Sequence, residues 1–353
     1  MDTSTTSSLN AGPTTAPGLP VPVQSQPHVD ADSAVTGLAT PRRALVLGGG
    51  GSTGNAWLIG IIAGLFDAGL DITTADLTIG TSAGSTAAAQ LAGATPTELF
   101  DAIVAASPPE PANNVRAGRV GAGVVGSGVA GFGVVGSGAR PVVDQMERTG
   151  NIMSASTDMA DMRRRLGAAA IDMAEALEGC SARWRDTVAT RLPQAQWPER
   201  TMLLTAVDAR TGDPVVFHRH SGVDLVDAVA ASCASGFAYS IGSNQYIDGG
   251  YRANAENADL ATGYSRVLVL APFGGRTRTP LEWGMHLAGQ VDALHANGSQ
   301  VETIFPHNES EYMFGVRAMD LSLRPSAARA GFQQGKALAP HVADFWSSPD
   351  LPG

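Results

Sequence analysis

The sequence predicts an α/β fold built on parallel strands, and two observations carry this prediction. Short apolar runs alternate with helical periodicities between residues 44 and 93, and the same rhythm returns after residue 200. Strand–helix–strand order in this rhythm implies parallel pairing through right-handed crossovers. Apolar residues make up 44% of the 353 residues and charged residues 16%, so the chain can bury a sizeable core.

The first part of the predicted sheet is local in sequence. Residues 44–47 form a short apolar run that ends in glycines, as a buried strand does, and residues 76–79 form a second. Each run is followed by a helical pattern, over 55–69 and 83–93. Further on, the patterns predict strands at 202–207, 214–217 and 266–270, and helices at 224–232 and 325–346, the last with a break at Pro340.

The segment 105–200 departs from this rhythm, and we expect it to be an insertion that covers the site as a lid. Residues 120–139 are glycine-rich and carry no charge, so a membrane span, a lipid-touching lid and a plain loop are all consistent with them. Residues 158–180 predict an amphipathic helix, with an apolar stripe from Met159 to Cys180. That stripe fits the core, a second copy in a homodimer, or lipid headgroups, and we predict peripheral membrane contact through 120–180.

The two ends of the chain and its charge limit the classes of function. Residues 1–40 are rich in Ser, Thr, Pro and Ala, which predicts a disordered tail before a folded domain over 41–353. The net charge of −10 argues against nucleic-acid partners. The first residues lack the basic and apolar regions of a secretory signal, so we expect a cytoplasmic protein, in part peripheral at the membrane.

A nucleophile motif stands between the second strand and the second helix. Gly80-Thr81-Ser82-Ala83-Gly84 has the G-x-S-x-G pattern, and its place between strand and helix is that of a nucleophile elbow. Glycine is needed on both sides because larger side chains would collide in so sharp a turn. Ser82 is therefore the predicted nucleophile, with Gly80 and Gly84 as its support.

A glycine loop, residues 48–54, joins the first strand to the first helix. It has no Gly-Lys-Ser/Thr ending, which argues against a P-loop. The spacing of Gly49, Gly51 and Gly54, with Asp71 farther on, also fits a dinucleotide-binding motif. Beside a nucleophile elbow, the same loop would offer backbone N–H groups to an oxyanion. We predict an oxyanion hole of Gly49, Gly50 and Gly51, supported by Gly54.

A third motif supplies a carboxylate, Asp248, followed by Gly249 and Gly250. The ordered set of glycine loop, Gly-x-Ser-x-Gly and Asp-Gly-Gly resembles the patatin-like phospholipase family over roughly residues 43–275. The resemblance implies a three-layer α/β/α sandwich and a lipid or ester substrate. It also implies a Ser–Asp dyad without histidine, in which Ser82 forms an acyl-enzyme and Asp248 is the base.

Three positions depart from the family pattern. Thr53 stands where many relatives carry a cation, Gly236 where a proline is common, and Glu256 where an Asn-Pro step is common. The rival hypotheses are an esterase with a Ser–Asp–His triad, which would use His286, His295, His307 or His341, and a lipid-binding scaffold with weak turnover. No Cys/His cluster has metal-ligand spacing, and we expect neither a metal nor a cofactor.

Overall fold

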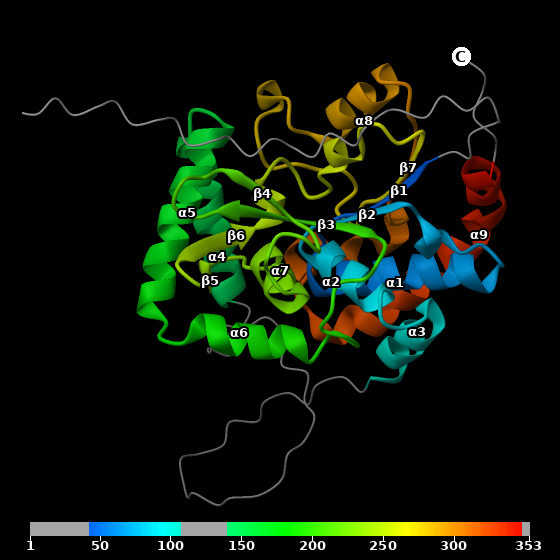
Figure 1. The fold of residues 1–353 in the computed structure, drawn as a ribbon, viewed down its shortest axis with the longest axis horizontal. Helices are drawn as coiled ribbons and strands as arrows, with labels where there is room; N and C mark the ends of the chain where they lie inside the picture. Colours follow the sequence, from blue (N-terminus) through cyan, green and yellow to red (C-terminus); the bar gives the residue numbers. More distant parts are fainter. Residues whose placement is uncertain (1–41, 107–139, 348–353) are drawn as a thin grey trace, which may run out of the picture. The chain divides into compact units, whose positions relative to one another are not determined.

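The computed structural model of the chain describes residues 42–106 and 140–347 (Figure 1). The predicted tail at 1–40 lies outside these residues, as do residues 107–139 of the predicted insertion, which include the glycine-rich segment at 120–139. The proposed lid, its membrane contact and the homodimer therefore stay predictions. None of the helices in the described ranges combines the length and the apolar character that crossing a membrane requires.

A mixed sheet forms the centre of the fold, in the strand order β5-β6-β3-β2-β1-β7-β8, with β4 paired to β3. Five neighbouring strands, β3, β2, β1, β7 and β8, are parallel to one another. At the β3 end of the sheet, β4, β5 and β6 pair antiparallel. Their bounds are β1 (Arg43–Leu47), β2 (Leu77–Gly80), β3 (Thr201–Asp208), β4 (Pro214–Phe217), β5 (Tyr239–Ile241), β6 (Asn244–Asp248), β7 (Arg266–Leu270) and β8 (Gln300–Ile304).

Helices cover both faces of this sheet (Figure 1). One face carries α1 (Gly51–Asp67), α2 (Ala83–Leu91), α3 (Pro96–Ala105), α6 (Cys180–Ala189), α7 (Leu225–Ser232) and α9 (Arg324–Ser347). The other face carries α5 (Met159–Ala176) and α8 (Leu287–Ala296). Helix α4 (Arg140–Ala155) precedes α5 in the chain. Alternate residues of a strand supply the two cores: Leu45 and Leu47 face α1, and Ala44 and Val46 face the side of α8.

The predicted α/β fold with three layers is thus confirmed, and the predicted strands and helices are present with shifted ends. The predicted break at Pro340 is wrong, because α9 runs through Pro340 without interruption. Buried neighbours on both sides of it, Ala339 and Val342, hold the helix in place despite the lost N–H. On α5, Met159, Met162 and Leu166 pack on Val207 and Ile247 of the sheet, so the first half of the apolar stripe faces the core.

Candidate active site

Ser82 occupies a strained turn between β2 and α2. Its backbone angles are φ 52° and ψ −114°, and Asn257 is the other non-glycine residue of the described ranges with a positive φ. Such a conformation is costly for a residue with a Cβ and persists where the surrounding structure imposes it, often at a functional site. The turn places Ser82 directly before the N-terminus of α2, whose dipole favours developing negative charge.

Close backbone approach explains the glycines on both sides of Ser82. A Cβ on Gly84 would lie 1.8 Å from the carbonyl oxygen of Leu47 in β1, and one on Gly80 would lie 2.7 Å from the Cα of Ser85. Both contacts are with backbone atoms, which cannot rotate away. The predicted need for glycine at these positions therefore has its cause in the packing of the elbow on itself and on β1.

Asp248 lies at the end of β6, on the other side of β3 from Ser82 in the sheet. The Ser82 hydroxyl donates to Asp248 Oδ2 at 2.8 Å, and the Gly250 N–H donates to Oδ1 at 2.8 Å. Burial raises the pKa of Asp248 to about 6, although these two hydrogen bonds oppose the shift. A Cβ on Gly249 would meet the Thr205 carbonyl oxygen at 2.2 Å, so this turn also requires glycine.

The glycine loop faces Ser82, but its N–H groups are not equivalent. The Gly49 N–H donates to the Ala255 carbonyl at 2.7 Å. The Gly50 and Gly51 N–H groups have no acceptor among the described residues. The Gly54 N–H donates to the Gly50 carbonyl at 2.9 Å, and this hydrogen bond closes the first turn of α1. Of the three predicted oxyanion donors, two are thus free and the third is engaged.

Two side chains at the end of α7, whose roles the sequence did not predict, support the elbow. The Ser82 N–H donates to Ser232 Oγ at 3.0 Å, and the Cys233 thiol donates to the Ser82 carbonyl at 3.0 Å. Ser232 Oγ also lies 2.5 Å from Ser85 Oγ. Burial raises the pKa of Cys233 to about 12, so this thiol stays protonated and serves as a donor.

A cavity of about 1120 Å³ opens over Ser82 and Asp248. The glycine loop, α2, α6 and the segment before α9 line it, with Trp184, Phe237 and Met162 among its apolar walls. No histidine of the described residues lines this cavity. His295 is bonded to the Ser299 carbonyl and His341 pairs with Glu302, so neither belongs to a triad with Ser82.

Comparison with known proteins identifies the family of this chain. A family model described as "Patatin-like phospholipase" matches residues 45–259, a range that includes all three motifs. The chain belongs to the patatin-like phospholipase family. Membership of this family of lipid-degrading hydrolases supports lipid acyl hydrolase activity in general.

Two of the solved structures that are similar to this patatin-like chain have low sequence identity to it. VipD from Legionella pneumophila has 12% sequence identity and a TM-score of 0.41, covering 86% of this chain and 68% of its own. The type III effector protein ExoU has 14% identity and a TM-score of 0.26, covering 84% of this chain and 53% of its own. The chain therefore spans about half the length of ExoU. No curated protein sequence matches it.

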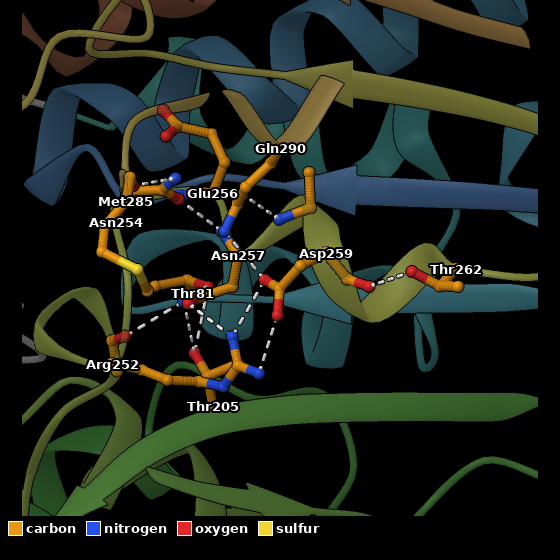
Figure 2. Close-up of polar contacts among 12 residues, drawn as sticks. Thr81, Thr205, Arg252, Asn254, Glu256, Asn257, Asp259, Thr262, Met285 and Gln290 are labelled. Carbon is orange, nitrogen blue, oxygen red and sulfur yellow. Dashed lines mark hydrogen bonds and ion pairs between the residues drawn. The ribbon is translucent and has the colours of Figure 1, made fainter. Parts of the chain in front are cut away.

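A buried amide, Asn257, joins the two loops of this patatin-like site (Figure 2). Asn257 is fully buried, and the two protons of its Nδ2 are shared among Thr81 Oγ1 at 3.0 Å, the Gly249 carbonyl at 3.0 Å and Thr205 Oγ1 at 3.3 Å. Thr81 directly precedes Ser82, and Gly249 directly follows Asp248. One side chain thus connects the residue before the predicted nucleophile to the residue after the predicted base.

A second layer holds Asn257 itself in place, as Figure 2 shows. Arg252 donates to Asn257 Oδ1 at 3.1 Å and binds both carboxylate oxygens of Asp259 at 2.9 Å. Asn254 Oδ1 accepts the Asn257 N–H at 2.7 Å, and Gln290 donates to Asp259 at 2.9 Å. Arg252 Nε is buried without a partner among the described residues, but the bonds made by Nη1 and Nη2 and by the two amides fix the relative positions of the loops that they join.

Replacing Asn257 is expected to destabilise the fold. Asn257→Gly keeps the positive φ of 55° but removes the amide, which should lower the free energy of unfolding by about 1–3 kcal/mol. Asn257→Ala should lose roughly 1 kcal/mol more, because alanine is strained at a positive φ. Urea denaturation of both variants measures the two effects separately. A glycine variant as stable as the wild type would show that the amide does not hold the loops together.

Glu256, next to this network, is a buried carboxylate that forms no hydrogen bond with the described residues. Its side chain is 1% exposed, and neither of its oxygens has a hydrogen-bond partner there. Burial raises the pKa of Glu256 to about 7. Its Cγ lies 3.3 Å from the position of a Cβ on Gly48, so it packs below the glycine loop rather than in the cavity.

Proposed function

We propose that this chain is a serine lipid acyl hydrolase in which Ser82 is the nucleophile and Asp248 the general base. The hydrogen bond of 2.8 Å between Ser82 Oγ and Asp248 Oδ2 is the observation that carries the proposal. This distance lies within the range that direct proton transfer requires. The cavity above the pair, with its apolar walls, supports a lipid ester as the substrate.

The first half of the reaction forms an acyl-enzyme. Asp248 accepts the hydroxyl proton as Ser82 Oγ attacks the carbonyl carbon of the ester, and the carbonyl oxygen becomes an oxyanion. When this intermediate collapses, the bond to the alcohol breaks and the proton on Asp248 passes to the alcohol as it leaves. In the second half, Asp248 takes a proton from water, the resulting hydroxide attacks the acyl carbon, and the proton returns to Ser82 as the fatty acid departs.

The backbone N–H groups of Gly50 and Gly51 are the best-placed hydrogen-bond donors for the oxyanion. Their N–H groups have no acceptor among the described residues, and they lie beside the N-terminus of α1. A donor aimed at the developing charge typically contributes about 100- to 1000-fold in rate. Gly49 could join them only if its hydrogen bond to Ala255 breaks. A Cβ on Gly49 would instead lie 3.6 Å from the Cβ of Ser82, so this glycine leaves room for the substrate.

A fluorophosphonate probe tests the proposal directly, because it labels only an activated serine. We expect the purified wild type to gain the mass of one probe, and peptide mapping to place it on Ser82. Ser82→Ala should remain unlabelled, whereas His286→Ala, His295→Ala, His307→Ala and His341→Ala should label at the wild-type rate. The wild type and the four histidine variants should also hydrolyse p-nitrophenyl esters, whereas Ser82→Ala should not. The preferred chain length among these esters would define the acyl group.

The results that would contradict the proposal are distinct from one another. Label that persists in Ser82→Ala would assign the nucleophile to another residue. Dependence on one of the four histidines would favour a Ser–Asp–His triad. A wild type that neither labels nor hydrolyses any ester would favour a lipid-binding scaffold of the same fold.

A further inference from the structure

Arginine side chains gather in the cavity that holds Ser82. Among the described residues that line it are five arginines, Arg183, Arg191, Arg276, Arg278 and Arg324, but only two carboxylates. One of these, Glu311, pairs with Arg276, and the other is Asp248. The described lining thus carries more cations than carboxylates, whereas the whole chain has a net charge of −10. A concave site lined by one sign of charge concentrates ions of the other sign.

Arg324 is the arginine whose surroundings are most informative. It begins α9 and reaches to the first turn of α1, where Nη1 donates to the Ser52 carbonyl at 2.8 Å and to Ser52 Oγ at 3.1 Å. Its Nη2 donates to Asn55 Oδ1 at 3.1 Å. All three acceptors are neutral, and within the described ranges no carboxylate lies at ion-pair distance from Arg324.

The charge on Arg324 is nevertheless retained. Burial lowers the pKa of Arg324 to about 10, and repulsion by the nearby Arg191 contributes to the shift, so the group is still a cation at neutral pH. Burying a cation is costly unless a counter-charge offsets the lost hydration. The neighbouring protein groups hold the guanidinium in place but do not neutralise its charge. This arrangement favours the binding of an anion.

The contacts of Arg324 place its guanidinium next to the glycine loop that carries the proposed oxyanion donors. Ser52 directly follows Gly51, one of the proposed oxyanion donors, and Asn55 Nδ2 lies 3.5 Å from the carbonyl oxygen of Ala83, the residue after Ser82. Thr53, inside the loop, is fully buried and its hydroxyl donates to the Met313 carbonyl. The glycine loop itself therefore carries no positive charge. Arg324, at the start of α9, places its positive charge at Ser52 of this loop.

Arg191 is the second cation of this region. It lies just beyond α6, lines the same cavity, and its guanidinium carbon is 5.2 Å from the centre of the Trp184 ring. Its charge is close enough to Arg324 to lower the pKa of that side chain. A second cation near Arg324 adds to the attraction that this end of the cavity exerts on an anion.

We infer that Arg324 and Arg191 form a subsite for an anionic group carried by the ester substrate, a phosphate or a carboxylate. This inference rests on the proposed function and narrows its substrate class to anionic acyl esters. The planar guanidinium of Arg324 is held by Ser52 and Asn55 in one orientation, which suits oxygen anions that accept hydrogen bonds in the plane of the fork.

Three hexanoyl esters built on the same three-carbon backbone test this inference: those of glycerol 3-phosphate, glycerate and glycerol, each acylated on its primary alcohol. They share the acyl chain and a primary alcohol, and they differ in carrying a phosphate, a carboxylate or no charge. We expect a higher kcat/KM for the wild type on at least one anionic ester than on the neutral ester. The preferred anion distinguishes a phosphate from a carboxylate ligand.

The variant Arg324→Met should reduce the ratio of kcat/KM for the anionic to the neutral ester by about tenfold or more, because a charge-assisted hydrogen bond is lost. Arg324→Lys should retain part of the ratio. The control Arg219→Met removes an exposed arginine outside the cavity and should keep the wild-type ratio. Turnover of the neutral ester reports in each case that the protein is folded.

Two outcomes would overturn the subsite while the proposed function stands. One is a wild type that cleaves the neutral ester as well as both anionic esters. The other is an unchanged ratio in Arg324→Met. If no ester is cleaved and Ser82 takes no fluorophosphonate label, the proposed function fails and the subsite fails with it.

Discussion

Replacing Asp248 with asparagine is expected to lower kcat for ester hydrolysis by roughly 100- to 10,000-fold, the usual contribution of a general base. Asparagine keeps the shape of the side chain and can still bond to the Ser82 hydroxyl, but it cannot take up the proton. KM should change much less, because the cavity walls are untouched. Steady-state kinetics on a p-nitrophenyl ester measure both constants.

The same carboxylate determines the expected pH dependence. Burial raises the pKa of Asp248 from 3.8 to about 6, and only the ionised form can accept a proton from Ser82. Activity is therefore present above about pH 6 and is lost as the pH falls through that value. An aspartate with an ordinary pKa would lose activity only about two units lower. The profile of kcat/KM between pH 4 and 9 shows which applies.

Two controls separate this effect from others. Asp101→Asn changes an exposed carboxylate on α3 and should leave both kcat and the profile unchanged. The four histidine variants should also keep the wild-type profile, because no histidine of the described residues lines the cavity. A profile that moves with a histidine variant, or an Asp248→Asn variant with wild-type kcat, would exclude Asp248 as the base.

Replacing Gly84 with alanine is expected to be the most damaging substitution for the fold. The added methyl carbon would lie 1.8 Å from the Leu47 carbonyl oxygen and 2.4 Å from its carbon, and both belong to the buried strand β1. Neither atom can move without disturbing β1 or the elbow. We expect a loss of more than about 4 kcal/mol in the free energy of unfolding, which would leave little folded protein. Denaturation midpoints, or the yield of soluble protein, measure it.

Gly289→Ala in α8 is the matched control for this loss. The nearest neighbour of its added carbon is His286 Cε1 at 3.4 Å, an ordinary contact, and alanine favours a helix over glycine by about 0.5–1 kcal/mol. Gly289→Ala should therefore be neutral or slightly stabilising. If Gly84→Ala unfolds at the same midpoint as the wild type, the close approach of the elbow to β1 is not required for folding.

Local patterns predicted much of the fold because strand and helix periodicities depend on neighbouring residues. The predicted strand at 202–207 lies within β3 (Thr201–Asp208), and the predicted helix at 224–232 closely matches α7 (Leu225–Ser232). The short edge strand β8 and the helices α3, α6 and α8 had weaker patterns and were not predicted. Their formation depends on packing against the sheet, which raises the stability of segments with modest propensity.

The candidate site shows the same division. The glycine, serine and aspartate motifs were predicted from sequence because each is a tight turn that only certain residues can form. The engaged N–H of Gly49 was not predictable, because its acceptor, Ala255, comes from a loop that is distant in sequence. The roles of Ser232 and Asn257 were also missed, since neither belongs to a pattern that signals a hydrogen bond to the elbow.

The sequence by itself determined the family, the order of the strands and helices that carry the motifs, and the turns at Ser82 and Asp248. These depend on interactions within a few residues of the chain. Only the tertiary structure decided that Ser82 meets Asp248 across 166 residues, and that Arg324 reaches Ser52 across 272. Such contacts depend on how the sheet and its helices pack, and no spacing in the sequence specifies them.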